Sequence, residues 1–139
     1  MNYQEFALLA LLVALVGCGE QGPNGPSYQL DQTPLAHSVV YLYRPYSVVG
    51  VVLLVPVHCG DDSVALKPGT YHKFTVDPGQ LDCSATTGGK SAVDIDAKAG
   101  QTYFIRQSIL TWFVLVPDTY LVLKTAEEAQ PEIEQCKEQ

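Results

Sequence analysis

Short runs of apolar or alternating residues, separated by turn residues every six to twelve positions, recur from His37 to Lys124. No helical period interrupts them before Thr125. This spacing is typical of an all-β domain in which antiparallel strands form a sandwich or barrel. We predict an antiparallel β-sandwich of about seven strands over residues 37–124, immunoglobulin-like or similar in architecture.

Two runs are apolar at both alternating positions, residues 38–44 and residues 50–57. A strand covered on both faces has this pattern, and so has a buried helix. Valines dominate both runs, and Pro45 and Pro56 close them, which favours strands because β-branched residues and terminal prolines suit that structure. We therefore expect two central strands here.

Three later runs alternate between apolar and polar residues: residues 71–76, 80–85 and 93–98. Alternation is typical of strands with one buried and one solvated face. The Pro-Gly pairs in residues 67–70 and 77–80 place proline and glycine where a type II turn requires them. These segments predict hairpins.

The end of the chain predicts further strands and a short helix. Apolar runs cover residues 101–109, 111–116 and 119–123. Thr125 followed by Glu128 matches a capping box, which opens a helix. Because a proline lacks an N–H, Pro131 predicts a break or restart in the tail of residues 125–139, which we expect to pack on the edge of the sandwich or to trail from it.

Near the N-terminus, residues 6–17 form an unbroken apolar run of twelve. A membrane-spanning helix needs about 20 such residues, so the run fits the hydrophobic core of a signal peptide. The four residues that end at Cys18, LVGC, resemble the lipobox of bacterial lipoproteins. This resemblance implies cleavage between Gly17 and Cys18, diacylglycerol on the Cys18 sulfur and an acyl group on the freed amine. A buried apolar helix with a core cysteine is the alternative.

The predicted organisation is therefore a signal peptide in residues 1–17, a lipidated cysteine with a flexible tether in residues 18–36, the β-domain and the helical tail. The tether is rich in Gly, Pro, Gln and Asn and has no hydrophobic period. Gly19, where an aspartate would resemble an inner-membrane retention signal, favours the outer membrane facing the periplasm. The first five residues hold no Lys or Arg, which leaves a start upstream of Met1 open.

Four segments in the same order resemble a family of small bacterial lipoproteins built on a domain of unknown function. They are residues 40–45 (VYLYRP), 66–71 (LKPGTY), 76–79 (VDPG) and 99–106 (AGQTYFIR). The resemblance implies an exported β-domain with no assigned activity. Residues 58–62 (HCGDD) depart from the family pattern, so any chemistry there would belong to this chain alone.

The charge of the chain argues against a nucleic-acid role. Beyond Cys18 lie eight basic and fourteen acidic residues, a net charge of −6. The basic residues are scattered singly from Arg44 to Lys137, whereas phosphate backbones require clustered Lys and Arg. We expect the membrane, reached through the lipid on Cys18, and an unidentified envelope protein as partners.

Cys59 and Cys83 are consecutive cysteines, and an exported protein matures in an oxidising compartment. A disulfide between them would close a loop of about 25 residues and stabilise the fold by roughly 3 kcal/mol. Buried free thiols are the alternative, and Cys136 is either left over or a competing partner.

The remaining polar residues do not form a recognisable catalytic or metal-binding motif. His58 and Cys59 are adjacent on a strand and point to opposite faces, so they cannot easily share a ligand set with Asp61 and Asp62. His72 lies on an apolar face, where a core or edge histidine is usual.

Asp94 and Asp96 share one face, but the solvated side of a strand explains them. Arg44 and Arg106 each end an aromatic run, where we expect them to brace strand ends, and contact with a partner is the alternative. We predict a protein without catalytic residues, metal or cofactor that acts as a structural or interaction module. A small secreted metal-dependent or Cys/His enzyme and an inhibitor or ligand-binding module are the alternatives.

Overall fold

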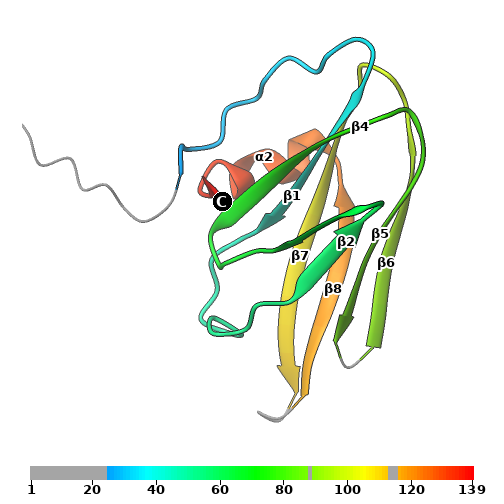
Figure 1. The fold of residues 1–139 in the computed structure, drawn as a ribbon. Coiled ribbons are helices and arrows are strands. Elements are labelled where there is room, and N and C mark those ends of the chain that lie inside the picture. Colours follow the sequence, from blue (N-terminus) through cyan, green and yellow to red (C-terminus); the bar gives the residue numbers. More distant parts are fainter. Residues whose placement is uncertain (1–24, 88, 113–115) are drawn as a thin grey trace, which may run out of the picture.

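The computed structural model describes residues 25–87, 89–112 and 116–139. Within these ranges the chain is a β-sandwich of nine strands with one short C-terminal helix, which confirms the predicted fold class (Figure 1). The apolar run, Gly17, Cys18 and Gly19 lie outside the described residues. The elements are β1 (Ser38–Arg44), β2 (Pro56–Cys59), β3 (Asp62–Ala65), β4 (Thr70–Val76), β5 (Gly79–Thr87), β6 (Gly89–Ala97), β7 (Thr102–Trp112), β8 (Val116–Lys124), α2 (Ala126–Ile133) and β9 (Lys137–Glu138).

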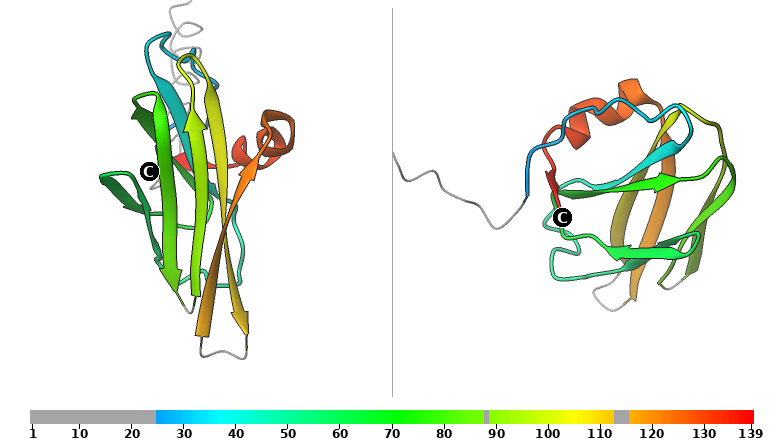
Figure 2. Two further views of the ribbon diagram at one scale, coloured as in Figure 1. Left: turned by 90° about the vertical axis from the view of Figure 1, so that its right-hand side faces the viewer. Right: turned by 45° about the horizontal axis from the view of Figure 1, so that its top comes forward.

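The two sheets face each other, with strand orders β8-β7-β1-β4-β9 and β3-β2-β5-β6 (Figure 2). Strand β1 pairs antiparallel with β4 but parallel with β7, and β4 pairs parallel with β9. The sandwich is therefore mixed, and the expectation of purely antiparallel pairing is wrong in these two places. Parallel neighbours need a crossover connection, and between β1 and β7 the chain passes through strands β2 to β6, four of which lie in the opposite sheet.

Strand β1 lies in the centre of its sheet and is buried along its whole length. Val40 and Leu42 face the core between the sheets, and Tyr41 and Tyr43 face a second apolar cluster on the outer side. The apolar residues at both alternating positions thus reflect burial on both faces, as predicted for this strand.

Helix α2 lies on the outer face of the five-stranded sheet, where Ala129 and Ile133 are buried in the second cluster. The predicted capping box is present, since Thr125 Oγ1 accepts from the Glu128 N–H and Glu128 Oε2 accepts from the Thr125 N–H. The expected break at Pro131 is wrong, because the helix continues through the proline. It ends two residues later, so the missing N–H affects only the last part of a short helix.

Residues 25–36, the described part of the segment expected to be a tether (residues 18–36), contain side chains and backbone groups that contact this outer face. Gly25 N–H donates to the Glu138 carbonyl over 2.9 Å, and Lys73 Nζ lies 2.8 Å from Asp31 Oδ2. Tyr28 packs against the second cluster. Alternation in β4 predicts a solvated face, but Tyr71 on that face is buried because this segment covers it.

Residues 50–57 are not a central strand, which corrects a prediction made from their apolar pattern. Residues 48–52 turn, Leu53 N–H donates to the Gly50 carbonyl, and Pro56 begins β2 instead of closing a strand. Gly50 has a φ of +70°, and a Cβ there would lie 2.8 Å from Ile109 Cγ2, so this turn requires glycine. We call residues 45–55, between β1 and β2, the apolar loop.

The described residues of the predicted strand at 111–116 belong to two different strands, and residues 113–115 lie outside the described residues. Thr111 and Trp112 end the long strand β7, and Val116 begins its hairpin partner β8. Neither Gly nor Pro stands between residues 109 and 112, so nothing in the sequence ends β7 earlier. The β2–β3 hairpin and β9 were not predicted, because strands of two to four residues carry little periodic signal.

Candidate functional site

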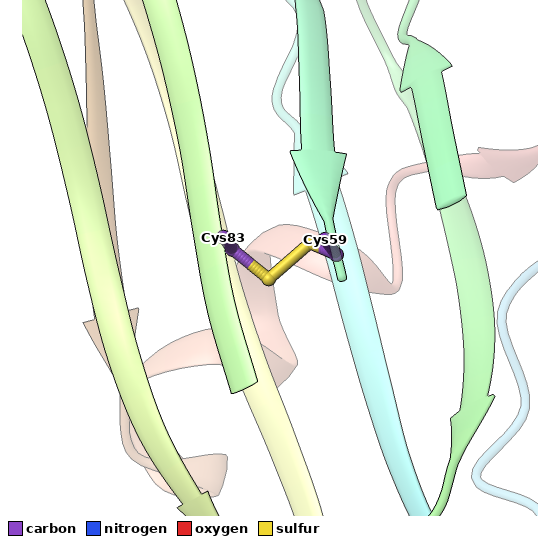
Figure 3. The surroundings of a disulfide bond; sticks show 2 residues. All are labelled: Cys59 and Cys83. Carbon is purple, nitrogen blue, oxygen red and sulfur yellow. A yellow bond between two sulfur atoms is a disulfide. The ribbon is translucent and has the colours of Figure 1, made fainter. Parts of the chain in front are cut away.

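Cys59 and Cys83 form a disulfide between β2 and β5 (Figure 3). The two residues are directly opposite in the antiparallel register, with Cα atoms 4.1 Å apart. Both are almost completely buried in the core between the sheets. The bridge joins two strands of the same sheet and is shielded from solvent, so it is a structural bond in a dry environment.

Cys136 lies apart from this pair, on the other side of the five-stranded sheet, and its thiol is free. Burial raises its pKa to about 11, and the nearby Glu132 carboxylate adds to the shift. The nucleophilic form of cysteine is the thiolate, so Cys136 is unreactive in the folded protein near neutral pH.

The predicted cluster at the end of β2 does not converge. His58 is exposed on the face opposite to the buried Cys59, and the Cys59 sulfur is bonded to Cys83. Asp61 and Asp62 are exposed in the turn that starts β3. The residues therefore offer neither a free thiolate beside a histidine nor a shared ligand set.

His72 is half-buried on the inner side of β4 and packs edge-on against Phe74, with ring centroids 4.7 Å apart. Asp94 and Asp96 are exposed on β6, and Asp94 lies directly opposite Asp82 of β5. These carboxylates form a solvated acidic face of the four-stranded sheet.

Over the described ranges, no three His, Cys, Asp or Glu side chains are grouped so that they could bind a metal ion. In the same part of the chain, no helix has the length and hydropathy to cross a membrane.

Arg44 braces the apolar loop from inside the fold. Its side chain is 3% exposed, and its Nη atoms donate to the carbonyls of Gly50, Leu53 and Leu66 over 2.6 to 2.9 Å. Burial lowers the pKa of the guanidinium. The sequence predicts that Arg44 braces a strand end, but its guanidinium holds the loop that follows β1 and the Leu66 carbonyl instead.

Arg106 is half-exposed on the outer side of β7 and fixes the helix. Its Nε lies 3.1 Å from Glu132 Oε1, and Glu132 Oε2 accepts a 2.7 Å hydrogen bond from the Tyr43 phenol. Burial and this hydrogen bond raise the pKa of Tyr43 strongly. One carboxylate therefore joins α2 to β1 and β7, a role that the sequence did not reveal.

Aromatic rings form the centre of the second cluster. Tyr28 meets Tyr41 and Tyr71 edge-on, and Tyr41 stacks on Phe104 with ring centroids 5.5 Å apart. The buried Tyr41 Oη makes no hydrogen bond of normal geometry among the described residues, although the backbone of Asp31 lies near it. This cluster holds the N-terminal segment on the sheet.

Among the described residues, the apolar loop exposes a group of neighbouring apolar side chains. Residues 45–57 contain no charged residue and nine Val, Leu or Tyr side chains. Most of these side chains point into solvent, where single exposed apolar residues are common but a group of six is not. The exposed ones are Tyr46, Val48, Val49, Val51, Val52 and Leu54.

Two concave regions adjoin these elements. A groove of about 190 Å³ separates residues 45–49 from residues 106–110. A shallow depression of about 400 Å³ lies between the N-terminal segment and Glu138. The first is smaller than the sites of 300 to 1,000 Å³ that enclose small-molecule ligands, and the second is open to solvent.

Comparison with models of known protein families and with curated proteins finds no match to this chain.

Proposed function

We propose that this protein is a lipid-anchored component of the bacterial cell envelope that works as an interaction or structural module without catalysis. In this proposal the signal peptide is cleaved between Gly17 and Cys18, and lipid on Cys18 holds the β-sandwich at the membrane. The outer membrane, with the domain facing the periplasm, is the proposed location, because Gly19 does not match the inner-membrane retention signal.

The single observation that carries the proposal is the buried disulfide between Cys59 and Cys83. Structural disulfides form and persist in oxidising compartments and are rare in the cytosol. Such a bond supports export, and the apolar run that ends at Cys18 would supply the export signal. The two features are independent and support the same location.

The chemistry of the described side chains supports a role in binding over one in catalysis. Cys59 is consumed by the disulfide, Cys136 is buried with a raised pKa, and His58 is exposed away from both. A nucleophile needs a neighbouring base and an open cleft, and these residues lie on separate faces. The solvent-facing apolar loop is instead the kind of surface that binds another molecule or a membrane.

Replacement of Cys18 by Ser tests the anchor, because the thiol is the lipid acceptor and the unlipidated chain is no substrate for the lipoprotein peptidase. The wild-type chain should incorporate labelled fatty acid, partition into detergent and shorten by 17 residues, as mass spectrometry of the purified protein would measure. Cys18→Ser should do none of these.

Cys136→Ser is the matched control, since it removes a thiol but leaves the acceptor unchanged. A wild-type chain that carries no fatty acid, or a Cys18→Ser chain that matures normally, would refute the proposal. Hydrolytic or metal-dependent activity that disappears with His58→Ala would favour the enzyme alternative instead.

A further inference from the structure

We propose that the apolar loop, residues 45–55, lies against the lipid bilayer to which the chain is anchored, so that the domain contacts the membrane through a defined side. The inference rests on the proposed function, because the anchor at Cys18 brings the loop to the bilayer. The loop itself supplies the contact surface.

The first argument is the chemistry of the loop. Tyr46, Val48 and Val52 are 71%, 75% and 86% exposed, and no charged residue interrupts the stretch from residue 45 to residue 57. Insertion of a charge into the bilayer is costly, so a lipid-contacting loop must lack charges. Hot spots of protein interfaces favour Trp, Tyr and Arg and are poor in Val, which dominates this loop.

The second argument is the backbone of the loop, because polar groups that enter lipid must be hydrogen-bonded within the protein. Arg44 binds the Gly50 and Leu53 carbonyls from the inside of the fold. The N–H groups of Val49, Val51 and Leu53 donate within the loop, to Ser47 Oγ and to the carbonyls of Val48 and Gly50. Part of the loop backbone is therefore hydrogen-bonded within the protein at its turn, while the apolar side chains around it face outward.

The third argument is the position of the loop relative to the anchor. Gly25 N–H donates to the Glu138 carbonyl, and the neighbouring Lys137 N–H donates to the Gly69 carbonyl over 3.0 Å. Gly69 N–H donates in turn to the Arg44 carbonyl, and a Cβ on Gly69 would lie 3.7 Å from the Cβ of Tyr46. Gly25, where the described chain begins, is thus linked through β9 and Gly69 to Arg44, the residue that precedes the apolar loop. These residues lie on one side of the sandwich (Figures 1 and 2).

The length of chain between Cys18 and Gly25 limits how far the domain can stand from the membrane. Seven residues span at most roughly 25 Å when fully extended. Because Gly25 is hydrogen-bonded to Glu138, the part of the sandwich at Glu138 must stay close to the lipid.

A nitroxide label at residue 52 tests the contact directly. The lipidated full chain carrying Val52→Cys and Cys136→Ala is labelled and reconstituted in vesicles of phosphatidylethanolamine and phosphatidylglycerol. Accessibility to oxygen, which concentrates in lipid, and to a water-soluble nickel complex is then measured by electron paramagnetic resonance. We expect the label to lose its nickel accessibility and to gain oxygen accessibility relative to the same chain in detergent-free buffer after removal of the lipid anchor.

Leu35→Cys is the matched control, because Leu35 is an aliphatic residue that is 90% exposed at the opposite end of β1. Seven strand residues separate the two ends by roughly 20 Å. The label at residue 35 should keep its nickel accessibility on the vesicles. A residue 52 label that stays as accessible to nickel as the control would overturn the inference.

Exclusion of both reagents at residue 52 would also overturn it, since the loop would then be covered by a second copy of the chain and not by lipid. Fatty-acid labelling of the same preparation separates the two hypotheses. Without lipid on Cys18 the proposed anchor fails, whereas a lipidated chain with a water-exposed residue 52 refutes the loop contact alone. Val52→Asp combined with Val48→Asp should release the loop from lipid without unfolding the chain, because both side chains face solvent.

Discussion

The phenol of Tyr43 on β1 donates a 2.7 Å hydrogen bond to Glu132 on α2, 89 residues later in the chain. Glu132 also accepts a hydrogen bond from Arg106 Nε of β7, so a single carboxylate holds the helix on two neighbouring strands. We expect Tyr43→Phe to lower the free energy of unfolding by about 1.5 kcal/mol, because a hydrogen bond to a charged group is lost. Urea denaturation followed by circular dichroism measures this change.

Tyr41→Phe is the control for that measurement, since Tyr41 is buried on the same strand and its Oη makes no hydrogen bond of normal geometry among the described residues. Its removal should change the free energy of unfolding by less than about 0.5 kcal/mol or raise it, because an unsatisfied buried hydroxyl is costly. Equal losses in the two variants would contradict the assigned role of Glu132.

Tyr28 should stabilise the domain although it lies in the segment that the sequence suggests is a tether. Its ring makes edge-on contacts with Tyr41 and Tyr71, so Tyr28→Ala should cost about 2 kcal/mol of unfolding free energy. Leu35→Ala, a truncation of an exposed side chain seven residues later, should change it by less than about 0.5 kcal/mol. A segment that is only a tether would give the same small effect for both variants in a thermal or urea melt.

Loss of the disulfide should destabilise the fold. Cys59→Ala with Cys83→Ala should lower the free energy of unfolding by about 3 kcal/mol, because the unfolded chain regains the entropy of an open loop. Mass spectrometry of non-reduced digests should yield one peptide pair linked through these cysteines.

Free Cys136 should react with iodoacetamide only after unfolding, since it is buried and its pKa is raised to about 11. A peptide that links Cys136 to either partner would contradict the pairing.

Alkaline pH should unfold the protein through its tyrosine cluster. Burial, with smaller contributions from neighbouring charges, raises the pKa of Tyr28 and of Tyr71 from 10 to about 12. Below pH 10 both phenols are neutral in the folded and unfolded chains, so their contribution to the free energy of unfolding is at its maximum and does not depend on pH. Between pH 10 and about 12 the unfolded chain loses these protons first, and the free energy of unfolding falls.

Urea melts over this pH range measure the slope, and phenolate absorbance reports the ionisation. Tyr28→Phe removes one of the titrating groups, so the decline should become shallower even though the starting stability changes little. An unchanged slope in this variant would show that other groups control alkaline unfolding.

The sequence alone determined the sandwich and most of its strands. Alternating residues and Pro-Gly turns defined β4, β5 and β6, and the run of residues 38–44 defined the doubly buried β1. The capping residues Thr125 and Glu128 defined the start of α2. These signals are local, because periodicity and turn chemistry act between neighbours in the chain.

Tertiary structure decided which apolar surfaces are covered. The runs at residues 38–44 and 50–57 are both apolar at alternating positions of either parity, yet the first is buried on both faces and much of the second faces solvent. The hydrogen bonds of Arg44 and the positive φ of Gly50 stabilise the second run as a loop. Neither feature is visible in the hydrophobic periodicity of the sequence. A hydrophobic pattern indicates which residues favour burial, but it does not indicate which other part of the protein will bury them.

The candidate sites divide in the same way. The pairing of Cys59 with Cys83 could be anticipated from chain order and from the predicted dry face, and the structure joins these two sulfurs. The bridge from Tyr43 through Glu132 to Arg106 could not be anticipated, because its members lie 26 to 89 residues apart. Their proximity depends on the parallel pairing of β1 with β7 and on the packing of α2, which only long-range contacts specify.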